Sequence, residues 1–266
     1  MRARIGTIAS SQASGVPIDP HAEAYLNVAG ISEPAHRDAF HVFVAYIKEK
    51  GIWQLRDAIW PMKGGNSASH SLNLKDPRDS DDAFRLQFFG GWVHNEYGAK
   101  GNSWNTYART FYVPATHGDR DSAGLDFYSR TNIPYGYEIE MGCWNGSSGH
   151  WLMHSYGGSM SVSINSSYSN ISAQSNTLGL LLGQRINSST LEYYLKGELI
   201  DTVSISATSA PNMEVYLGCR NDGGAVLPMS KECAFASVGR ALSPTQVGEW
   251  EYAIQNLQTA FNIEVE

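Results

Sequence analysis

The sequence has no apolar run approaching the roughly 20 residues that a membrane-spanning helix requires, so a membrane protein is not expected. Charged residues make up only 17% of the 266 residues, and acidic residues outnumber basic ones to give a formal net charge of −7. We therefore expect no basic surface for nucleic acid. Residues 1–15 contain arginines but no apolar core, which argues against a cleaved signal peptide.

Cysteine is also scarce. The three cysteines are an odd number and lack the spacing of a metal-binding motif. Cys143 and Cys219 fall on the apolar phase of predicted strands, so we expect them to be free, buried and small apolar side chains. This usage predicts a chain that is folded in a reducing cytoplasm, wherever it acts afterwards.

Glycine, with 26 residues, and tyrosine, with 14, are abundant instead, which suits many short strands joined by turns. From residue 64 onward, apolar residues alternate with polar ones in short runs that Gly, Asn, Ser and Pro separate. The clearest runs are 84–88, 125–127, 137–143, 160–164 and 213–219. About a dozen such strands without helices between them predict an all-β fold, a two-sheet antiparallel jelly-roll sandwich. No repeat of fixed period is present, which argues against a propeller or a solenoid.

Residues 191–205 predict a β-hairpin in that sandwich. Leu191, Tyr193 and Leu195 fall on one face, and Lys196-Gly197 occupies the turn. We expect one buried face. The run TLGLLLG at 177–183 is apolar on both phases and predicts a central strand.

Helices are predicted before and after the strands. Residues 1–18 form an extended arm or a disordered tail. Residues 19–62 form a helical lead-in, with one helix from Asp19 to Gly30, a second one capped by Ser32, and a shorter amphipathic piece at 52–60. Residues 63–266 form the sandwich, including a C-terminal helix at 244–262.

That C-terminal helix begins with strong signals. Ser243 is the cap, Pro244 is the first helical residue, and Gln246 completes a capping box. The helix carries an apolar stripe at Val247, Trp250, Ile254, Leu257 and Phe261. The stripe either packs on the protein's own sandwich or N-terminal helices, or forms a self-association seam.

Three stretches in order resemble the concanavalin A-like lectin/glucanase superfamily in its laminin-G-like jelly-roll branch. They are "LEYYLKGELIDT", "MEVYLGCRNDGG" and "CAFASVGRALSPTQVGEWEYAI". The resemblance covers roughly residues 64–255 and implies the jelly-roll fold, because these motifs are structural.

A second resemblance is to modules of uncharacterised tailed-bacteriophage virion proteins. The stretch from 51 to 94 matches their pattern at Gly51, Ile52, Trp53, Ala58, Ile59, Pro61, Gly64, Gly65, Ser69, His70, Asn73, Leu74, Lys75, Pro77, Arg78, Asp79, Asp81, 83–86, Gly90, Gly91, Trp92 and His94. "FYSRT" at 127–131 and "CAFASVG" at 233–239 are similar as well. The resemblance implies a non-enzymatic virion structural protein, either a capsid decoration protein or a fibre-type subunit.

Such a protein would be made in the host cytoplasm and end up in the virion, with capsid or tail subunits as partners and further copies of itself in a homo-oligomer. Its N-terminal arm would dock on a neighbouring virion protein through Arg2, Arg4, Ile5 and Ile8. Arms that order on assembly suit this role, because the ordering cost is met only when the partner is present.

Glycoside hydrolysis would need two carboxylates. Glu138 and Glu140 share one strand face, but the position of the acid holds Gly142 or Cys143. We interpret the two glutamates as residues of a solvated strand face and predict no enzyme. A depolymerase would require carboxylates from distant strands to converge.

Glycan binding is the alternative function, as a host-surface adhesin. Aromatic and amide residues in Gly-rich stretches could form such a site, and the candidates are Trp104, Asn105, Trp144, Asn145 and Trp151. The competing interpretation is that these tryptophans fill the core or brace turns.

Cofactors are not predicted. Calcium ligands occur in "RNDGG" at 220–224 and "HGDRD" at 117–121, but neither set has the spacing of a known loop. His70 and His94 are interpreted as hydrogen-bonded structural groups rather than zinc ligands or bases. The aspartate-rich turn around Pro77 is either a solvated charged loop or, as we expect, the site of an Arg78–Asp clamp that holds the entry strand to a neighbouring loop.

Overall fold

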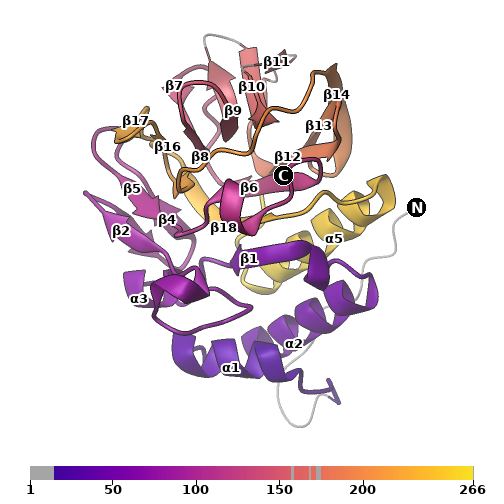
Figure 1. The fold of residues 1–266 in the computed structure, drawn as a ribbon. Coiled ribbons are helices and arrows are strands. Elements are labelled where there is room, and N and C mark those ends of the chain that lie inside the picture. Colours follow the sequence, from indigo (N-terminus) through magenta and orange to yellow (C-terminus); the bar gives the residue numbers. More distant parts are fainter. Residues whose placement is uncertain (1–14, 157–158, 168, 172–174, 266) are drawn as a thin grey trace.

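The computed structural model describes residues 15–156, 159–167, 169–171 and 175–265 (Figure 1). The arm residues Arg2, Arg4, Ile5 and Ile8 lie outside these ranges, so their docking role stays a prediction. Two sheets pack face to face, and a layer of helices covers one of them. The predicted two-sheet sandwich is confirmed.

The first sheet has the strand order β14-β13-β12-β6-β18-β4-β3, with β1 also paired to β18. Its strands are β1 (Arg56–Trp60), β3 (Val93–Asn95), β4 (Gly98–Lys100), β6 (Ala123–Ser129), β12 (Gly179–Asn187), β13 (Thr190–Leu195), β14 (Glu198–Ser204) and β18 (Glu232–Gly239). The predicted central strand is β12, which lies between β13 and β6.

The second sheet has the order β11-β10-β9-β8-β15-β5-β2, and β7, β16 and β17 add to it. Its strands are β2 (Gln87–Phe89), β5 (Tyr107–Arg109), β7 (Tyr137–Glu138), β8 (Met141–Trp144), β9 (Gly149–Tyr156), β10 (Ser159–Ser166), β11 (Asn170–Ile171), β15 (Tyr216–Leu217), β16 (Arg220–Asn221) and β17 (Ala225–Val226). The pairing is antiparallel except between β16 and β8.

Three longer helices form the third layer: α1 (Pro20–Ala29), α2 (Pro34–Glu49) and α5 (Pro244–Ala260). Two four-residue helices, α3 (Ser67–His70) and α4 (Pro114–His117), and two 3-10 turns, Trp53–Leu55 and Asp81–Ala83, lie in connections. In the part of the chain that the structure describes, no helix is long and apolar enough to cross a membrane.

Two large apolar cores result from this layering, and a small third cluster of Ile139, Trp151 and Met153 lies on the second sheet. One lies between the sheets and includes Phe127, Leu181 and Leu217. The other lies between the helices and the first sheet and includes Leu182 and Phe235. The first sheet is therefore buried on both faces, whereas the long helices leave the outer face of the second sheet uncovered (Figure 1).

The predicted hairpin is β13 and β14, and its turn has positive φ angles of 50° at Lys196 and 77° at Gly197. Leu191 and Tyr193 face the core between the sheets, as expected. The prediction of a single buried face is wrong for β13, because Tyr194 on the other face packs into the core beneath the helices.

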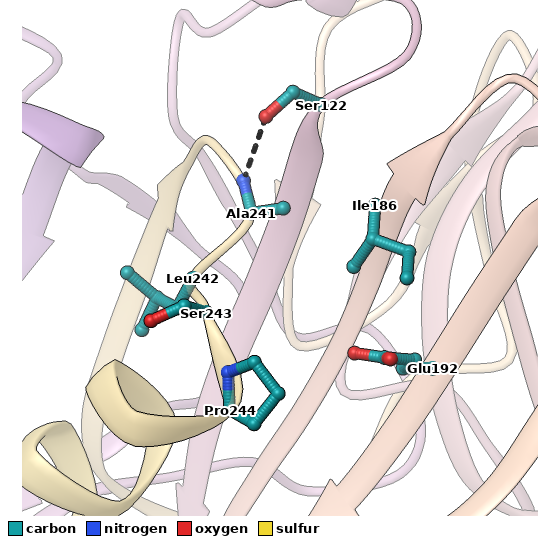
Figure 2. Close-up of a pocket in the computed structure, with 7 residues that line it drawn as sticks. All are labelled: Ser122, Ile186, Glu192, Ala241, Leu242, Ser243 and Pro244. Carbon is teal, nitrogen blue, oxygen red and sulfur yellow. Dashed lines mark hydrogen bonds between the residues drawn. The ribbon is translucent and has the colours of Figure 1, made fainter.

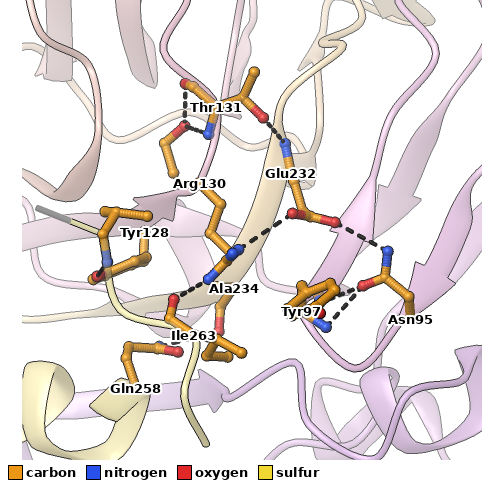
Figure 3. Close-up of polar contacts among 12 residues, drawn as sticks. Asn95, Tyr97, Tyr128, Arg130, Thr131, Glu232, Ala234, Gln258 and Ile263 are labelled. Atoms are coloured by element: carbon orange, nitrogen blue, oxygen red, sulfur yellow. Dashed lines mark hydrogen bonds and ion pairs between the residues drawn. The ribbon is translucent and has the colours of Figure 1, made fainter.

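The C-terminal helix begins as predicted, with a capping box between Ser243 and Gln246. Its apolar stripe is buried inside the molecule, and Trp250 packs against Phe43 of α2 with a ring-centroid distance of 5.8 Å. The intramolecular interpretation of the stripe is therefore confirmed. Residues 261–265 continue across the first sheet, where Arg130 donates to the carbonyl of Ile263 and pairs with Glu232 (Figure 3).

Three local expectations are wrong. Residues 52–60 are not a helix but a 3-10 turn followed by β1, because Ala58 and Trp60 face one core while Ile59 faces the other. Glu33, not Ser32, caps α2 by accepting from the amide of His36 at 2.7 Å. Residue 84 does not belong to a strand, since Phe84 has a φ of 56° and β2 begins only at Gln87.

Candidate functional site

Three aromatic rings form a row on the second sheet. Phe89 of β2 stacks on Tyr107 of β5 with centroids 4.8 Å apart and planes 10° apart. Tyr107 stacks in turn on Tyr216 of β15, at 5.1 Å and 20°. Each ring is half-buried. Offset stacking of this kind leaves part of each ring face uncovered.

Strand register places this row on the outer face. Phe88, Ala108 and Leu217 are paired across the same three strands and belong to the core between the sheets. Side chains alternate between the two faces of a strand, so Phe89, Tyr107 and Tyr216 point away from that core. The row therefore lies on the face that the long helices leave uncovered.

A fixed arginine borders the row. Arg109 is in register with Tyr216, and its Nε lies 3.0 Å from Oε2 of Glu214. The other carboxylate oxygen, Oε1, accepts from the amide of Phe111 at 2.7 Å, and the Arg109 guanidinium lies 4.5 Å from the centroid of the Phe111 ring. The hydrogen bond to Glu214 raises the pKa of Arg109.

Trp104 stands at the Phe89 end of the row, at the tip of a hydrogen-bonded turn. The Oδ1 of Asn102 accepts from the amides of Trp104 at 2.9 Å and Asn105 at 3.1 Å. The Oδ1 of Asn105 accepts from Asn102 Nδ2 at 2.8 Å and from the amide of Gly91 at 3.3 Å. These bonds fix the turn against the chain that follows Phe89.

Gly90 allows this close approach. Its φ is 82°, and a Cβ added there would lie 2.3 Å from the carbonyl oxygen of Asn105. Only glycine fits between β2 and the Trp104 turn. The Trp104 side chain is 84% exposed, the largest exposure among the large apolar side chains described. A large aromatic group held in water on a fixed turn is typical of a binding surface.

The other predicted sugar-binding residues lie elsewhere on the same sheet. Trp151 is only 1% exposed, because Arg220 covers its ring at 4.9 Å and Trp144 packs edge-on at 5.3 Å. It offers no ring face to a ligand. Asn145 uses its Oδ1 within a turn, where it accepts from the amide of Ser148 at 2.8 Å. The structure thus groups Trp104 and Asn105 with the ring row, and separates them from the other three.

The prediction that Glu138 and Glu140 share a solvated strand face is wrong. Glu140 is fully buried and forms an ion pair with Lys231, which is also fully buried. Glu138 accepts from the amide and the hydroxyl of Ser230 at 3.0 and 2.6 Å. The strand is interrupted between Glu138, where β7 ends, and Met141, where β8 begins, so Glu140 turns inward instead of sharing a solvated face with Glu138. The two do not form an accessible acid and nucleophile pair.

Metal binding receives no support from the geometry. Within residues 15–265, apart from the gaps named above, no three His, Cys, Asp or Glu side chains are grouped to hold an ion. The carboxylate of Asp222 pairs with Arg220 at 2.6 Å, and that of Asp121 pairs with Arg120 at 3.0 Å. Both proposed calcium loops therefore have a carboxylate that is already engaged by an arginine.

His70 and His94 are hydrogen-bonded to each other, with 3.0 Å between their Nδ1 atoms, as expected for structural groups. Burial lowers the pKa of His70 to about 3, so the ring is neutral at physiological pH. Arg78 pairs with aspartates as expected, with its NH2 group 2.5 Å from Asp76 and its NH1 group 3.1 Å from Asp82. Both aspartates belong to the same exposed turn, so these pairs close the turn on itself and do not tie it to a neighbouring loop.

A shallow pocket lies on the other side of the molecule, where α5 begins (Figure 2). Its lining residues are Ser122, Ile186, Glu192, Ala241, Leu242, Ser243 and Pro244. The Glu192 carboxylate already accepts from Gln184 at 2.9 Å and from the Tyr194 hydroxyl at 2.8 Å. The lining contains no aromatic ring, so the ring row and Trp104 remain the better candidate site.

Comparisons with known proteins support the fold. No family model and no curated protein matches the chain. The binding domain of botulinum neurotoxin DC, solved with rat synaptotagmin II, is similar with a TM-score of 0.52 and 10% identity, over 76% of this chain and 52% of that one. A structure of botulinum neurotoxin type C, whose cell entry depends on interaction with two ganglioside molecules, also gives 0.52 and 10%, over 77% and 53%.

Domain 4 of the arabinanase AbnA from Geobacillus stearothermophilus, in complex with arabinotriose, aligns over 74% of this chain and 98% of its own, with 12% identity and a TM-score of 0.49. This chain spans about half the length of the two neurotoxin chains. At 10% identity, those two similarities show a shared sandwich fold and leave the function to the site itself.

The sequence indicated Trp104 and Asn105 but not the ring row. Phe89 and Tyr107 occupy the phase opposite to the core residues of their strands, where a polar side chain is expected. An aromatic residue at a position that should face solvent was the only sign of this row in the sequence. The row could not be predicted from it, because the pairing of β5 with β15 is needed to bring Tyr107 and Tyr216 together.

Proposed function

We propose that this protein binds carbohydrate on the outer face of its second sheet, through Trp104 and the ring row of Phe89, Tyr107 and Tyr216. The observation that carries the proposal is the exposed Trp104 on its hydrogen-bonded turn beside that row. The C–H faces of sugar rings pack on aromatic rings, and Asn105 and Gln87 add amide groups beside them. A preformed site of this kind loses little conformational entropy on binding.

The solved structures that share the fold agree with this proposal. One of the two botulinum neurotoxins has a cell entry that depends on interaction with two ganglioside molecules, and the binding domain of the other is in complex with rat synaptotagmin II. In those proteins the sandwich belongs to a region that recognises other molecules. We further propose that this chain is a binding module and not a hydrolase, in keeping with the buried Glu140.

The test is retention on immobilised polysaccharides and on a glycan array. Trp104→Ala should weaken binding by roughly tenfold, since losing about 60 Å² of buried apolar contact removes about 1.4 kcal/mol. The matched control is Tyr252→Ala on α5, an aromatic residue 38% exposed on the helical side, which should leave binding unchanged. Equal effects of the two variants, or no retention of the native protein on any glycan, would refute the proposal.

A second candidate concerns where the protein acts. We propose that it is incorporated into tailed-bacteriophage particles as a decoration or fibre-type subunit. Its N-terminal arm would anchor it to the particle, and its sandwich would face outward. The supporting observation is the run of matched positions from 51 to 94. In the structure these residues form a junction: Asn73 accepts from the amide of Ile59 at 3.0 Å, and Lys75 donates to the carbonyl of Trp53 at 2.8 Å.

This second candidate has its own experiment. Deletion of residues 1–18 should abolish incorporation into particles in a complementation assay while the purified variant keeps its glycan binding. If the truncated protein is incorporated normally, the arm does not anchor it. A release of reducing sugar above background from host polysaccharide would show that the protein is a hydrolase after all.

A further inference from the structure

The arginine that borders the ring row, Arg109, is already paired with Glu214 at 2.9 Å. Farther along the sheet, over the Trp151 ring, Arg220 is paired with Asp222 at 2.6 Å. Both pairs are partly buried, and Glu214 is held in place by the amide of Phe111 as well. The positive charge at this border is therefore neutralised within the protein.

The aspartate-rich turn before β2 adds negative charge near the same strands. Arg85, which lies 5.9 Å from the Phe111 ring on which Arg109 also packs, pairs with Asp79 at 2.8 Å and Asp81 at 2.9 Å. Each arginine of this turn contacts two aspartates, so the turn is acidic in total. An anionic ligand approaching β2 and β5 would meet paired arginines and surplus carboxylates.

The row itself is elongated, with Phe89 and Tyr216 stacked on either side of Tyr107. Its two centroid distances, 4.8 and 5.1 Å, extend it by about 10 Å across β2, β5 and β15, and the Trp104 turn lies past the paired ends of β2 and β5, opposite Gly91. This length exceeds one sugar ring. A chain of several sugar residues laid across the strands would use the whole row.

We propose that the ligand is an uncharged polysaccharide chain, bound in an extended form across β2, β5 and β15 up to Trp104; this inference rests on the proposed carbohydrate-binding function. A carboxylate or sulfate on the sugar would gain little from Arg109, because Glu214 already balances its charge and engages its Nε and NH2 groups. Neutral sugars need no free charge, because stacking and amide hydrogen bonds recognise them.

The experiment compares matched polysaccharides with the same backbone: dextran with carboxymethyl-dextran, methyl-esterified with de-esterified polygalacturonan, and the neutral and acidic members of the array. We expect the protein to be retained on the neutral polysaccharides and expect 0.5 M salt not to change this retention. Its affinity should rise from monosaccharide to trisaccharide ligands. Retention on acidic members that salt abolishes would overturn the inference and leave the proposed function standing. Retention on no member would overturn the proposed function itself.

A charge-unmasking variant gives a second readout. Glu214→Gln keeps the shape of the side chain and its acceptor for the Phe111 amide, but frees the charge of Arg109. It should gain at least about tenfold in affinity for the carboxylated members while neutral binding changes by less than about threefold. Asp222→Asn beside Trp151 is the matched control, since it unmasks Arg220 away from the row. If Glu214→Gln gains nothing over Asp222→Asn, Arg109 does not face the ligand.

Discussion

Replacing Lys231 with methionine should strand the buried carboxylate of Glu140. Both side chains are fully buried and ion-paired with each other, so the single variant removes the ammonium group that balances the Glu140 carboxylate. Breaking a buried pair in this way typically costs about 3–5 kcal/mol, because the remaining charge is uncompensated. With 266 residues at about 2.1 cal/mol/K each, the entropy of unfolding is about 0.6 kcal/mol/K. The melting temperature should therefore fall by about 5–9 °C.

The assay is thermal and denaturant unfolding of three variants: Lys231→Met, Glu140→Leu and the double replacement. The double variant should recover most of the loss, since a pair of apolar side chains leaves no buried charge. A loss below about 1 kcal/mol for Lys231→Met, or strictly additive losses in the double variant, would show that Glu140 is solvated after all.

Two further perturbations test other parts of the structure. Burial lowers the pKa of His150 to about 4, whereas the same side chain in the unfolded protein takes up a proton near pH 6.5. The free energy of unfolding should therefore fall by about 2 kcal/mol per buried histidine between pH 7 and 4.5. In denaturant unfolding, His150→Gln should lose less stability over this range than the native protein does. If the two proteins lose stability equally, His150 is protonated in the folded state. Gly90→Ala should move the Trp104 turn, because the added Cβ would lie 2.3 Å from the Asn105 carbonyl oxygen. The variant should therefore lower both glycan retention and stability. Gly224→Ala is the control, because its Cβ would meet open space and should change neither. Unchanged retention by Gly90→Ala would show that the position of this turn does not matter for binding.

The sequence allowed the sandwich to be predicted because alternation is a local property. The runs around Leu125 and Val162 each show which phase is apolar, and strands of this kind with no helices between them bury that phase by packing sheet on sheet. The ends of the helices were predictable for the same reason, since the signals at Asp19 and Ser243 lie within one turn of the helix that they begin.

Long-range pairing set the limits of prediction. Glu140 looked like a surface residue because its partner, Lys231, is 91 positions away in the chain. Residues 52–60 looked like an amphipathic helix because both phases are apolar, and only the pairing of β1 with β18 and the helices beyond it explain both faces. The site was half predictable: Trp104 belongs to a local Gly- and Asn-rich turn, whereas the ring row exists only once β5 and β15 are neighbours.

The helical layer has a consequence for how the molecule opens. Strands β6, β12 and β18 have neighbours on both edges, one core against the helices and another against the second sheet. Their amide protons can exchange with solvent only when both interfaces separate, so they should report the global unfolding equilibrium. Amides of β2 and β5 lie beneath a single core and can be released by smaller fluctuations. The proposed binding face would then lie on the strands whose amides exchange faster, and the slowly exchanging strands β6, β12 and β18 would lie behind them.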